Sequence, residues 1–304
     1  MKIAVTGASG LIGKALVKAL KSAGDDIVRV GRDAPGRDGP DLQWDPYGQL
    51  DPAALEGVDT IVHLAGHTVA GRWSDHKKSH ILNSRVRGTE TISMAAARMK
   101  TPPRALVSAS AIGYYGSRGD QTLTEESSAG DGFLAQVCRQ WEAATKPAEQ
   151  AGIRVVHARM GLVLAKEGGA LPKMLPAFHV GMGGIVGNGS QWWSWIALSD
   201  VISAIQMLIA SDSLCGAINL VSPNPVTNLE FTKALARAVR RPALFPLPTA
   251  AVRFFFGEMG VETLLASQRV LPKRLEEAGF RFQLPEILPA LRTELTKAKA
   301  VKGR

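Results

Sequence analysis

The first thirteen residues constrain the fold of this chain more than any other stretch. A short β-branched run, residues 3–6, ends at Gly7, and an apolar repeat with helical spacing begins at Leu11. Gly7 permits a tight turn, Gly10 omits a Cβ that would block a pyrophosphate, and Gly13 allows helix and strand to pack closely. The first helical N–H groups would then point at phosphates. This strand, Gly-x-x-Gly-x-x-Gly turn and helix predict a dinucleotide cradle, the alternative being a glycine turn without a ligand.

Up to about residue 165, short apolar runs alternate with segments of helical periodicity. The expected strands are residues 2–6, 26–31, 42–45, 59–65, 104–109 and 153–159, and the expected helices are residues 11–23, 52–56, 74–99 and 134–151. Such alternation indicates βαβ units and a parallel sheet covered on both faces. The order predicts an α/β fold with a Rossmann-type, doubly wound parallel sheet.

The rhythm changes after residues 168–169, where prolines and glycines interrupt the periodicity up to residue 189 and an aromatic run at 191–196 indicates a strand. Further segments are expected at residues 199–210, 217–221, 228–239, 249–256, 261–266, 272–278 and 285–295. We expect a Rossmann domain over residues 1–167, to which later segments return. A smaller C-terminal α+β substrate region over 168–295 and a basic flexible tail over 296–304 would follow.

The end of the second strand discriminates between the two nicotinamide cofactors. An acid there hydrogen-bonds the ribose 2′-hydroxyl of NAD, whereas a cation there receives the 2′-phosphate of NADP. Here Gly31 occupies the acid position and Arg32, with its forked guanidinium, follows it. Arg32 therefore predicts NADP(H). Asp33 keeps NAD as the alternative, and Arg32 as a solvated loop charge is a further one.

Two other strand ends complete the predicted cofactor site. Asp45 follows the third strand, where its carboxylate could accept a hydrogen bond from the adenine amino group, although an Asx residue before proline also commonly starts a turn. Residues 64–66 end the fourth strand with small residues, as a backbone passing beneath the adenine ribose requires. The predicted cofactor-binding residues are Gly7, Ser9, Gly10, Leu11, Ile12, Gly13, Gly31, Arg32, Asp45, Leu64, Ala65 and Gly66.

Several further motifs occur in order over nearly the whole chain. They are Thr6-Gly-Ala-Ser-Gly-Leu-Ile-Gly13, Asp59 to Gly66, Arg72-Trp73-Ser74, Ile81 to Thr89, Ser108 to Gly116, Phe133 to Ala143, Arg159 to Leu164, Gly187 to Ile196 and a set between Gly257 and Phe280. With them the chain resembles the extended short-chain dehydrogenase/reductase superfamily. More narrowly, it resembles the atypical "epimerase family" branch of YfcH-type proteins, including that family's C-terminal domain.

The resemblance adds three residues to the predicted cofactor site. It implies that Ser108 lies at the next strand end and that Arg85 and Arg159 face the cleft at the carboxyl edge of the sheet. For each arginine, the alternative is an ion pair with a carboxylate.

The acid–base pair that the superfamily resemblance implies is absent. In that plan a Tyr transfers a proton, a Lys four residues later lowers the Tyr pKa, and a Ser orients the carbonyl. None of the three tyrosines here has a lysine at that spacing. On the expected helix the tyrosine position falls on Phe133 or Leu134 and the lysine position on Val137 or Cys138. Either another acid is used, or the branch does little chemistry.

Ser110 and Tyr115 remain as catalytic candidates. Ser110 could hydrogen-bond a substrate carbonyl, and Tyr115 could donate a proton from the adjacent loop. Serines and tyrosines at strand ends also commonly satisfy backbone groups, so a structural role is the alternative for both. His63 and His67, and His76 and His80, lack a third ligand or a neighbouring Glu base, so we predict no metal site.

Composition limits the remaining classes. The chain has 304 residues and a net charge of +9, but four cations lie in the last nine residues and the others are scattered, so we expect anionic small-molecule ligands and no nucleic acid. A run of about 18 uncharged apolar residues and a signal-like N-terminus are both missing, which predicts no membrane partner and a cytoplasmic location. Cys138 and Cys215 have no metal-like spacing and are expected to be buried, reduced thiols.

Two functional hypotheses follow. The first is an NADP(H)-binding oxidoreductase- or epimerase-like enzyme that acts on a carbonyl or alcohol, with a nucleotide sugar suggested only by analogy. The second is a non-catalytic NADPH-binding sensor or scaffold, which the missing Tyr-x-x-x-Lys pair favours. The substrate and the oligomeric state are not predicted by the sequence.

Overall fold

The computed structural model describes residues 1–36 and 39–296, and its centre is one parallel sheet. The strands of this sheet are β1 (Lys2–Thr6), β2 (Asp26–Gly31), β3 (Leu42–Gln43), β4 (Thr60–His63), β5 (Ala105–Ala111), β7 (Arg154–Met160) and β11 (Gly216–Leu220). They are ordered β11-β7-β5-β4-β1-β2-β3, and every neighbouring pair is parallel. The predicted Rossmann-type α/β fold is confirmed.

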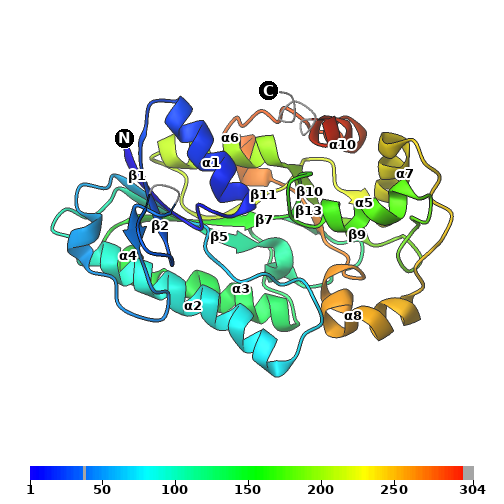
Figure 1. The fold of residues 1–304 in the computed structure, drawn as a ribbon, viewed down its shortest axis with the longest axis horizontal. Helices are drawn as coiled ribbons and strands as arrows, with labels where there is room; N and C mark the ends of the chain where they lie inside the picture. The colour runs from blue at the N-terminus through cyan, green and yellow to red at the C-terminus, as the bar shows by residue number, and fades with distance from the viewer. Residues whose placement is uncertain (37–38, 297–304) are drawn as a thin grey trace.

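Helices cover both faces of the sheet. On one face lie α1 (Leu11–Ser22) and α6 (Leu198–Ala210), and on the other lie α2 (Asp75–Ala97), α3 (Phe133–Ala143) and α4 (Lys146–Gln150) (Figure 1). Successive β1 side chains serve opposite layers, because a strand alternates its faces. Ile3 and Val5 pack in the core with Leu16 of α1, whereas Ala4 packs in the core with Ile92 of α2.

In a doubly wound fold with this strand order, the ligand crevice is expected between β1 and β4. From β1 the chain proceeds outward through β2 and β3 on one side, and through β4, β5 and β7 on the other. Ligands of doubly wound folds bind outside the carboxyl ends of the strands at such a switch point. Gly7 follows β1 and Leu64 follows β4, so both lie at this crevice.

The second region builds a smaller layer beside the sheet. Its elements are β8 (Leu162–Leu164), α5 (Leu171–His179), β9 (Trp192–Trp193), β10 (Trp195–Ala197), β12 (Val226–Thr227), α7 (Asn228–Val239), α8 (Thr249–Thr263), β13 (Arg269–Val270), α9 (Lys273–Glu277) and α10 (Ile287–Thr296). Trp193, Trp195 and Phe231 form part of its own core. Strand β13 pairs with β6 (Thr122–Leu123) of the first region, and β11 returns to the main sheet. The division at residue 167 stays a prediction.

Several expected elements differ from the structure. The expected helix 134–151 is two helices, α3 and α4, and the segments 249–256 and 261–266 are one element, α8, bent at Gly257 with φ of 58°. The aromatic strand 191–196 is two short strands. Cys138 is buried as expected, but Cys215 is exposed, because it precedes the edge strand β11. The predicted basic tail lies, after Thr296, outside the described residues. Among the helices described, none has both the length and the apolar character needed to cross a membrane.

Candidate functional site

Two glycines of the predicted cradle are required by close backbone packing. Gly7 has φ of 66°, and a Cβ there would lie 2.8 Å from the carbonyl carbon of Leu64. A Cβ on Gly13 would lie 2.1 Å from the carbonyl oxygen of Gly7. No side chain fits either position, so β1, the turn and α1 lie as close together as a dinucleotide cradle requires.

The start of α1 is open. Gly10 precedes the helix, supplies no side-chain cap, and is exposed together with Ser9. The first turn of α1, beginning with Leu11 and Ile12, contains no acid. Its N–H groups and the positive end of the helix dipole are therefore available to an anion.

Arg32, predicted to select NADP(H), and Asp45, predicted to contact the adenine, line the same cleft. Arg32 and Asp45 both line a cleft of about 480 Å³, together with Gln43, Trp44, Pro46 and Tyr47. The Arg32 side chain is exposed. Asp45 Oδ1 accepts a hydrogen bond of 2.9 Å from the Tyr47 N–H, so the Asx turn considered as its alternative is present. Gly31 packs against Pro40, since a Cβ on Gly31 would lie 3.0 Å from the Pro40 Cβ.

A buried threonine and histidine support the end of β4. The N–H groups of Leu64 and Ala65 both donate to Thr6 Oγ1, at 3.1 and 3.3 Å. Thr6 Oγ1 lies 2.8 Å from Nδ1 of His63, which is fully buried, and burial lowers the His63 pKa to about 4. The backbone at residues 64–66 is thus fixed beside Gly7.

Arg85 reaches this strand end from α2. Its Nη1 donates to the carbonyl oxygens of His67 (2.9 Å) and Ile81 (3.1 Å), and its guanidinium lies 4.9 Å from the Trp141 ring centroid. A Cβ on Gly66 would lie 3.4 Å from the Arg85 Cζ. Burial lowers the pKa of Arg85, and no ion pair joins it to a carboxylate of the described residues. Arg85 therefore places a cation beneath the β4 end.

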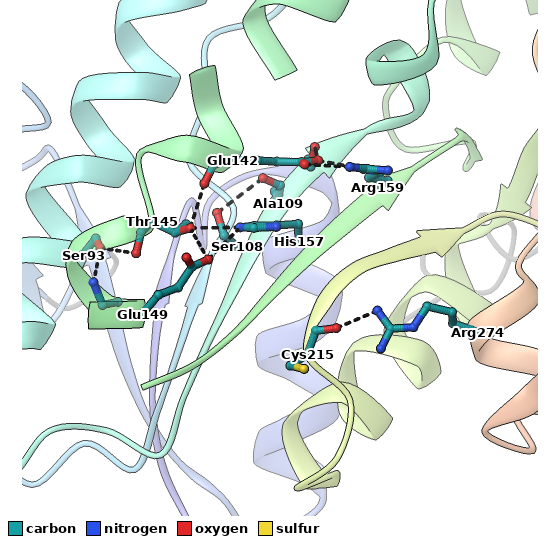
Figure 2. Close-up of polar contacts among 12 residues, drawn as sticks. Ser93, Ser108, Ala109, Glu142, Thr145, Glu149, His157, Arg159, Cys215 and Arg274 are labelled. Atoms are coloured by element: carbon teal, nitrogen blue, oxygen red, sulfur yellow. Dashed lines mark hydrogen bonds and ion pairs between the residues drawn. The ribbon is translucent and has the colours of Figure 1, made fainter. Parts of the chain in front are cut away.

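Arg159 takes the alternative considered for it and pairs with a carboxylate. Its Nε and Nη2 lie 2.8 Å from the two carboxylate oxygens of Glu142 on α3 (Figure 2). Its guanidinium also stacks 3.5 Å from the Tyr114 ring centroid. Burial opposes the charge of Arg159, but the hydrogen bonds to Glu142 outweigh it and raise the pKa of Arg159. Side-chain exposures of 5% and 11% make this a buried ion pair.

Both catalytic candidates belong to the same buried network. Ser110 is 3% exposed and donates to Glu142 Oε1 at 2.7 Å. Tyr115 is fully buried; its hydroxyl donates to Asn219 Oδ1 at 2.7 Å and accepts from Arg159 Nη1 at 3.0 Å. Burial raises the Tyr115 pKa, although Arg159 opposes this. The structure thus gives both hydroxyls structural partners.

Ser108, predicted to touch the cofactor, lies deeper still. It is 1% exposed and its hydroxyl donates to the Ala109 carbonyl at 3.4 Å (Figure 2). Its register partner His157 hydrogen-bonds Thr145 Oγ1 at 2.9 Å, and burial lowers the His157 pKa. These groups fill the layer between the sheet and α3–α4.

The helix expected to bear the acid–base pair presents apolar groups. Val137 and Cys138 are buried, and burial raises the Cys138 pKa to about 12. At the first turn, the N–H groups of Phe133 and Leu134 each donate to a carboxylate oxygen of Glu262 on α8, at 2.8 Å. The second region therefore caps α3 where the tyrosine position falls.

Sequence reasoning missed several polar residues near the cleft. Glu142 and Glu262 were not singled out, nor was the ion pair between Lys78 of α2 and Glu258 of α8. Lys78 Nζ also lies 5.1 Å from the Phe133 ring centroid. Within the described part of the chain, no group of three or more His, Cys, Asp or Glu side chains is placed to hold a metal ion. The sequence could have pointed to Glu142, because this acid adjoins Trp141 on the buried side of an amphipathic helix.

Comparison with known families gives two matches. Residues 3–220 match the NAD dependent epimerase/dehydratase family, and residues 247–294 match a domain of unknown function, DUF1731. Epimerase family protein Mb2239 of Mycobacterium bovis is 47% identical over 291 residues, which cover 95% of this chain and 96% of that protein.

Two solved structures are similar over nearly the whole chain. The crystal structure of human epimerase family protein SDR39U1 (isoform 2) with NADPH has a TM-score of 0.88 and 30% identity, covering 97% of this chain and 100% of that one. The nucleoside-diphosphate sugar epimerase of Corynebacterium glutamicum has a TM-score of 0.80 and 37% identity, covering 97% of this chain and 58% of that one.

Proposed function

The chain belongs to the NAD dependent epimerase/dehydratase family, and on this premise we propose that it binds NADP(H) and acts as an oxidoreductase or epimerase-like enzyme on a small carbonyl or alcohol. The observation that carries the cofactor choice is Arg32, an exposed guanidinium in the cleft that Asp45 also lines. A cation there suits the 2′-phosphate that distinguishes NADP from NAD. The human relative crystallised with NADPH supports the same choice.

The cradle has the space and the hydrogen-bond donors that the pyrophosphate of this cofactor needs. Gly7, Gly10 and Gly13 leave room for a pyrophosphate, and the uncapped start of α1 supplies N–H donors for it. Arg85 adds a positive charge that no acid of the described chain neutralises. When bound, NADPH supplies a hydride.

A nucleotide sugar is the substrate class that the relatives suggest. The Corynebacterium glutamicum relative is named as a nucleoside-diphosphate sugar epimerase. Its name and the family support this class for the present chain only by analogy, since a shared fold hosts many reactions.

The cofactor proposal is tested by replacing the cation that carries it. Arg32→Ala should weaken NADPH binding by about 10-fold or more, because a charge-assisted hydrogen bond contributes about 1.5–3 kcal/mol. NADH binding should change far less, since NADH lacks the 2′-phosphate. Both affinities are measured by quenching of tryptophan fluorescence, with Arg281→Ala, an exposed arginine outside the cleft, as the matched control. Equal losses for NADPH and NADH would refute the role of Arg32.

A second candidate function, a non-catalytic NADPH-binding sensor or scaffold, is favoured by the buried network. Ser110 and Tyr115 both have structural partners, and α3 offers no lysine to assist a phenol. Under this candidate, NADPH binds but no aldehyde, ketone or nucleotide sugar is turned over. Oxidation of NADPH by any such compound, abolished in Gly10→Leu, would exclude the sensor.

A further inference from the structure

Three histidines and a lysine gather on the rim of the cradle, between the end of β4 and the start of α2. We refer to His67, His76, Lys77 and His80 as the rim cluster. Lys77 Nζ donates a hydrogen bond of 3.0 Å to His67 Nε2, and the ring centroids of His67 and His80 are 5.8 Å apart. The Nε2 atoms of His80 and His76 are 3.2 Å apart. All three histidines are exposed, and the cofactor contacts proposed above use none of the four residues.

The neighbouring charges that act on His67 are positive. The pKa of His67 is lowered first by partial burial and then by the positive charges of Lys77, His80, Arg85 and Arg32. Across residues 1–36 and 39–296, no carboxylate forms an ion pair with any of these cations. The positive charges of Lys77, Arg85 and Arg32 therefore act together at His67, and such a field attracts an anion.

The position of His67 is fixed before any ligand arrives. Its N–H donates to Ser84 Oγ at 3.1 Å, and its carbonyl accepts from Arg85 Nη1 at 2.9 Å. His67 directly follows Gly66, whose backbone lies over the Arg85 guanidinium. The loop therefore fixes the backbone of His67 beside the cradle, while Lys77 and His80 lie in the first two turns of α2.

We propose that His67, Lys77 and His80 form an anion subsite that takes a phosphate group. A phosphate carries nearly two negative charges at neutral pH and accepts several hydrogen bonds. The ammonium of Lys77 and a ring N–H of each of His67 and His80 are matching donors. Phosphate binding at this subsite favours the protonated rings, so the bound anion and the proton stabilise each other. Arg85 and Arg32 add to the field without contacting the phosphate.

The phosphate can come from the dinucleotide cofactor or from a separate phosphorylated small molecule. Only this second point, the source, rests on the proposed cofactor function. The anion subsite itself requires no cofactor, so the two proposals fail separately.

Inorganic phosphate is the probe, and the ring pKa values of the histidines are the readout. The full chain, labelled with ¹⁵N, is titrated with acid and followed by NMR of the imidazole nitrogens, with His67→Gln to assign the resonance. Phosphate should raise the His67 pKa by about one unit, a tenfold gain in proton affinity, relative to chloride at equal ionic strength. Chloride is the essential control, because screening alone also raises a pKa among cations.

Variants then separate the subsite from general charge. Lys77→Gln should remove most of the rise in the His67 pKa that phosphate causes relative to chloride. Lys173→Gln, which replaces an exposed lysine on α5, should leave that rise intact. If the rise in the His67 pKa is lost in protein saturated with NADPH, the cofactor is the source of the phosphate group. If the rise persists, a separate phosphorylated molecule is the source. Identical His67 titrations in phosphate and chloride would overturn the proposal. Failure of the wild type to bind NADPH would refute only the cofactor proposal.

Discussion

The buried His63, which helps to hold the backbone of the cradle through Thr6, should make the folding stability of this protein sensitive to acid. The Leu64 and Ala65 N–H groups both point at Thr6 Oγ1, so the hydroxyl proton of Thr6 is left to bond His63 Nδ1. Nδ1 is then an acceptor, and the ring proton is on Nε2, which has no hydrogen-bond partner among the described residues. The site therefore fits a neutral imidazole.

The size of the effect follows from the pKa difference. In the unfolded chain a histidine protonates near its ordinary pKa of about 6.5, whereas burial lowers the folded His63 pKa to about 4. Between these values the unfolded state binds a proton that the folded state does not, so stability is lost as pH falls through this window. A difference of about 2.5 units corresponds to about 3 kcal/mol, a large share of a typical free energy of unfolding.

The assay is urea unfolding followed by tryptophan fluorescence at several pH values between about 7.5 and 4. The variant His63→Gln keeps a hydrogen-bond acceptor for Thr6 but cannot titrate. The wild-type advantage over this variant should shrink by about 3 kcal/mol across the window. His179→Gln, on the exposed side of α5, is the control and should follow the wild type. A wild-type advantage that stays constant with pH would refute the argument that His63 is neutral when folded.

Two other predictions rest on the cradle and on the buried network. Gly13→Ala should abolish NADPH binding and lower the melting temperature, because its methyl group would lie 2.1 Å from a carbonyl oxygen of the turn. In Gly10→Ala the nearest neighbour of the methyl group would be 3.2 Å away, so this variant should weaken NADPH binding with little effect on the melting temperature. Glu142→Gln should cost about 3–5 kcal/mol in urea unfolding, since it leaves Arg159 buried without its counter-charge; a loss below about 1 kcal/mol would show that the pair is solvated.

Local sequence signals predicted the elements whose ends have local causes. The strand 26–31 and the helix 228–239 have the predicted bounds, the helix because Thr227 and Glu230 form a capping box at its start. The break between α3 and α4 was missed although Pro147 marks it. Thr145, at that break, hydrogen-bonds both the Glu142 carbonyl and His157, and the second contact depends on tertiary packing.

The polar network could not be predicted because it depends on strand register. Ser110 lies opposite Arg159 only because β5 and β7 pair in that register, and Glu142 reaches both from a helix packed over them. The sequence left open whether Arg159 faces the cleft or pairs with a carboxylate, since spacing alone does not place Glu142. The glycines of the cradle were predictable because their reasons are steric and lie within thirteen residues.

Cofactor binding and turnover depend on different parts of this chain, so one does not imply the other. The cradle needs backbone geometry and the start of α1, and neither involves a titrating side chain. Proton transfer needs a group whose pKa lies near the working pH. At the lysine position of α3, burial raises the Cys138 pKa to about 12, so this thiol stays neutral and cannot lower the pKa of a neighbouring phenol. Any hydride transfer must therefore take its proton from a group other than Cys138, while Glu258 and Glu262 of α8 bind the first turns of α2 and α3.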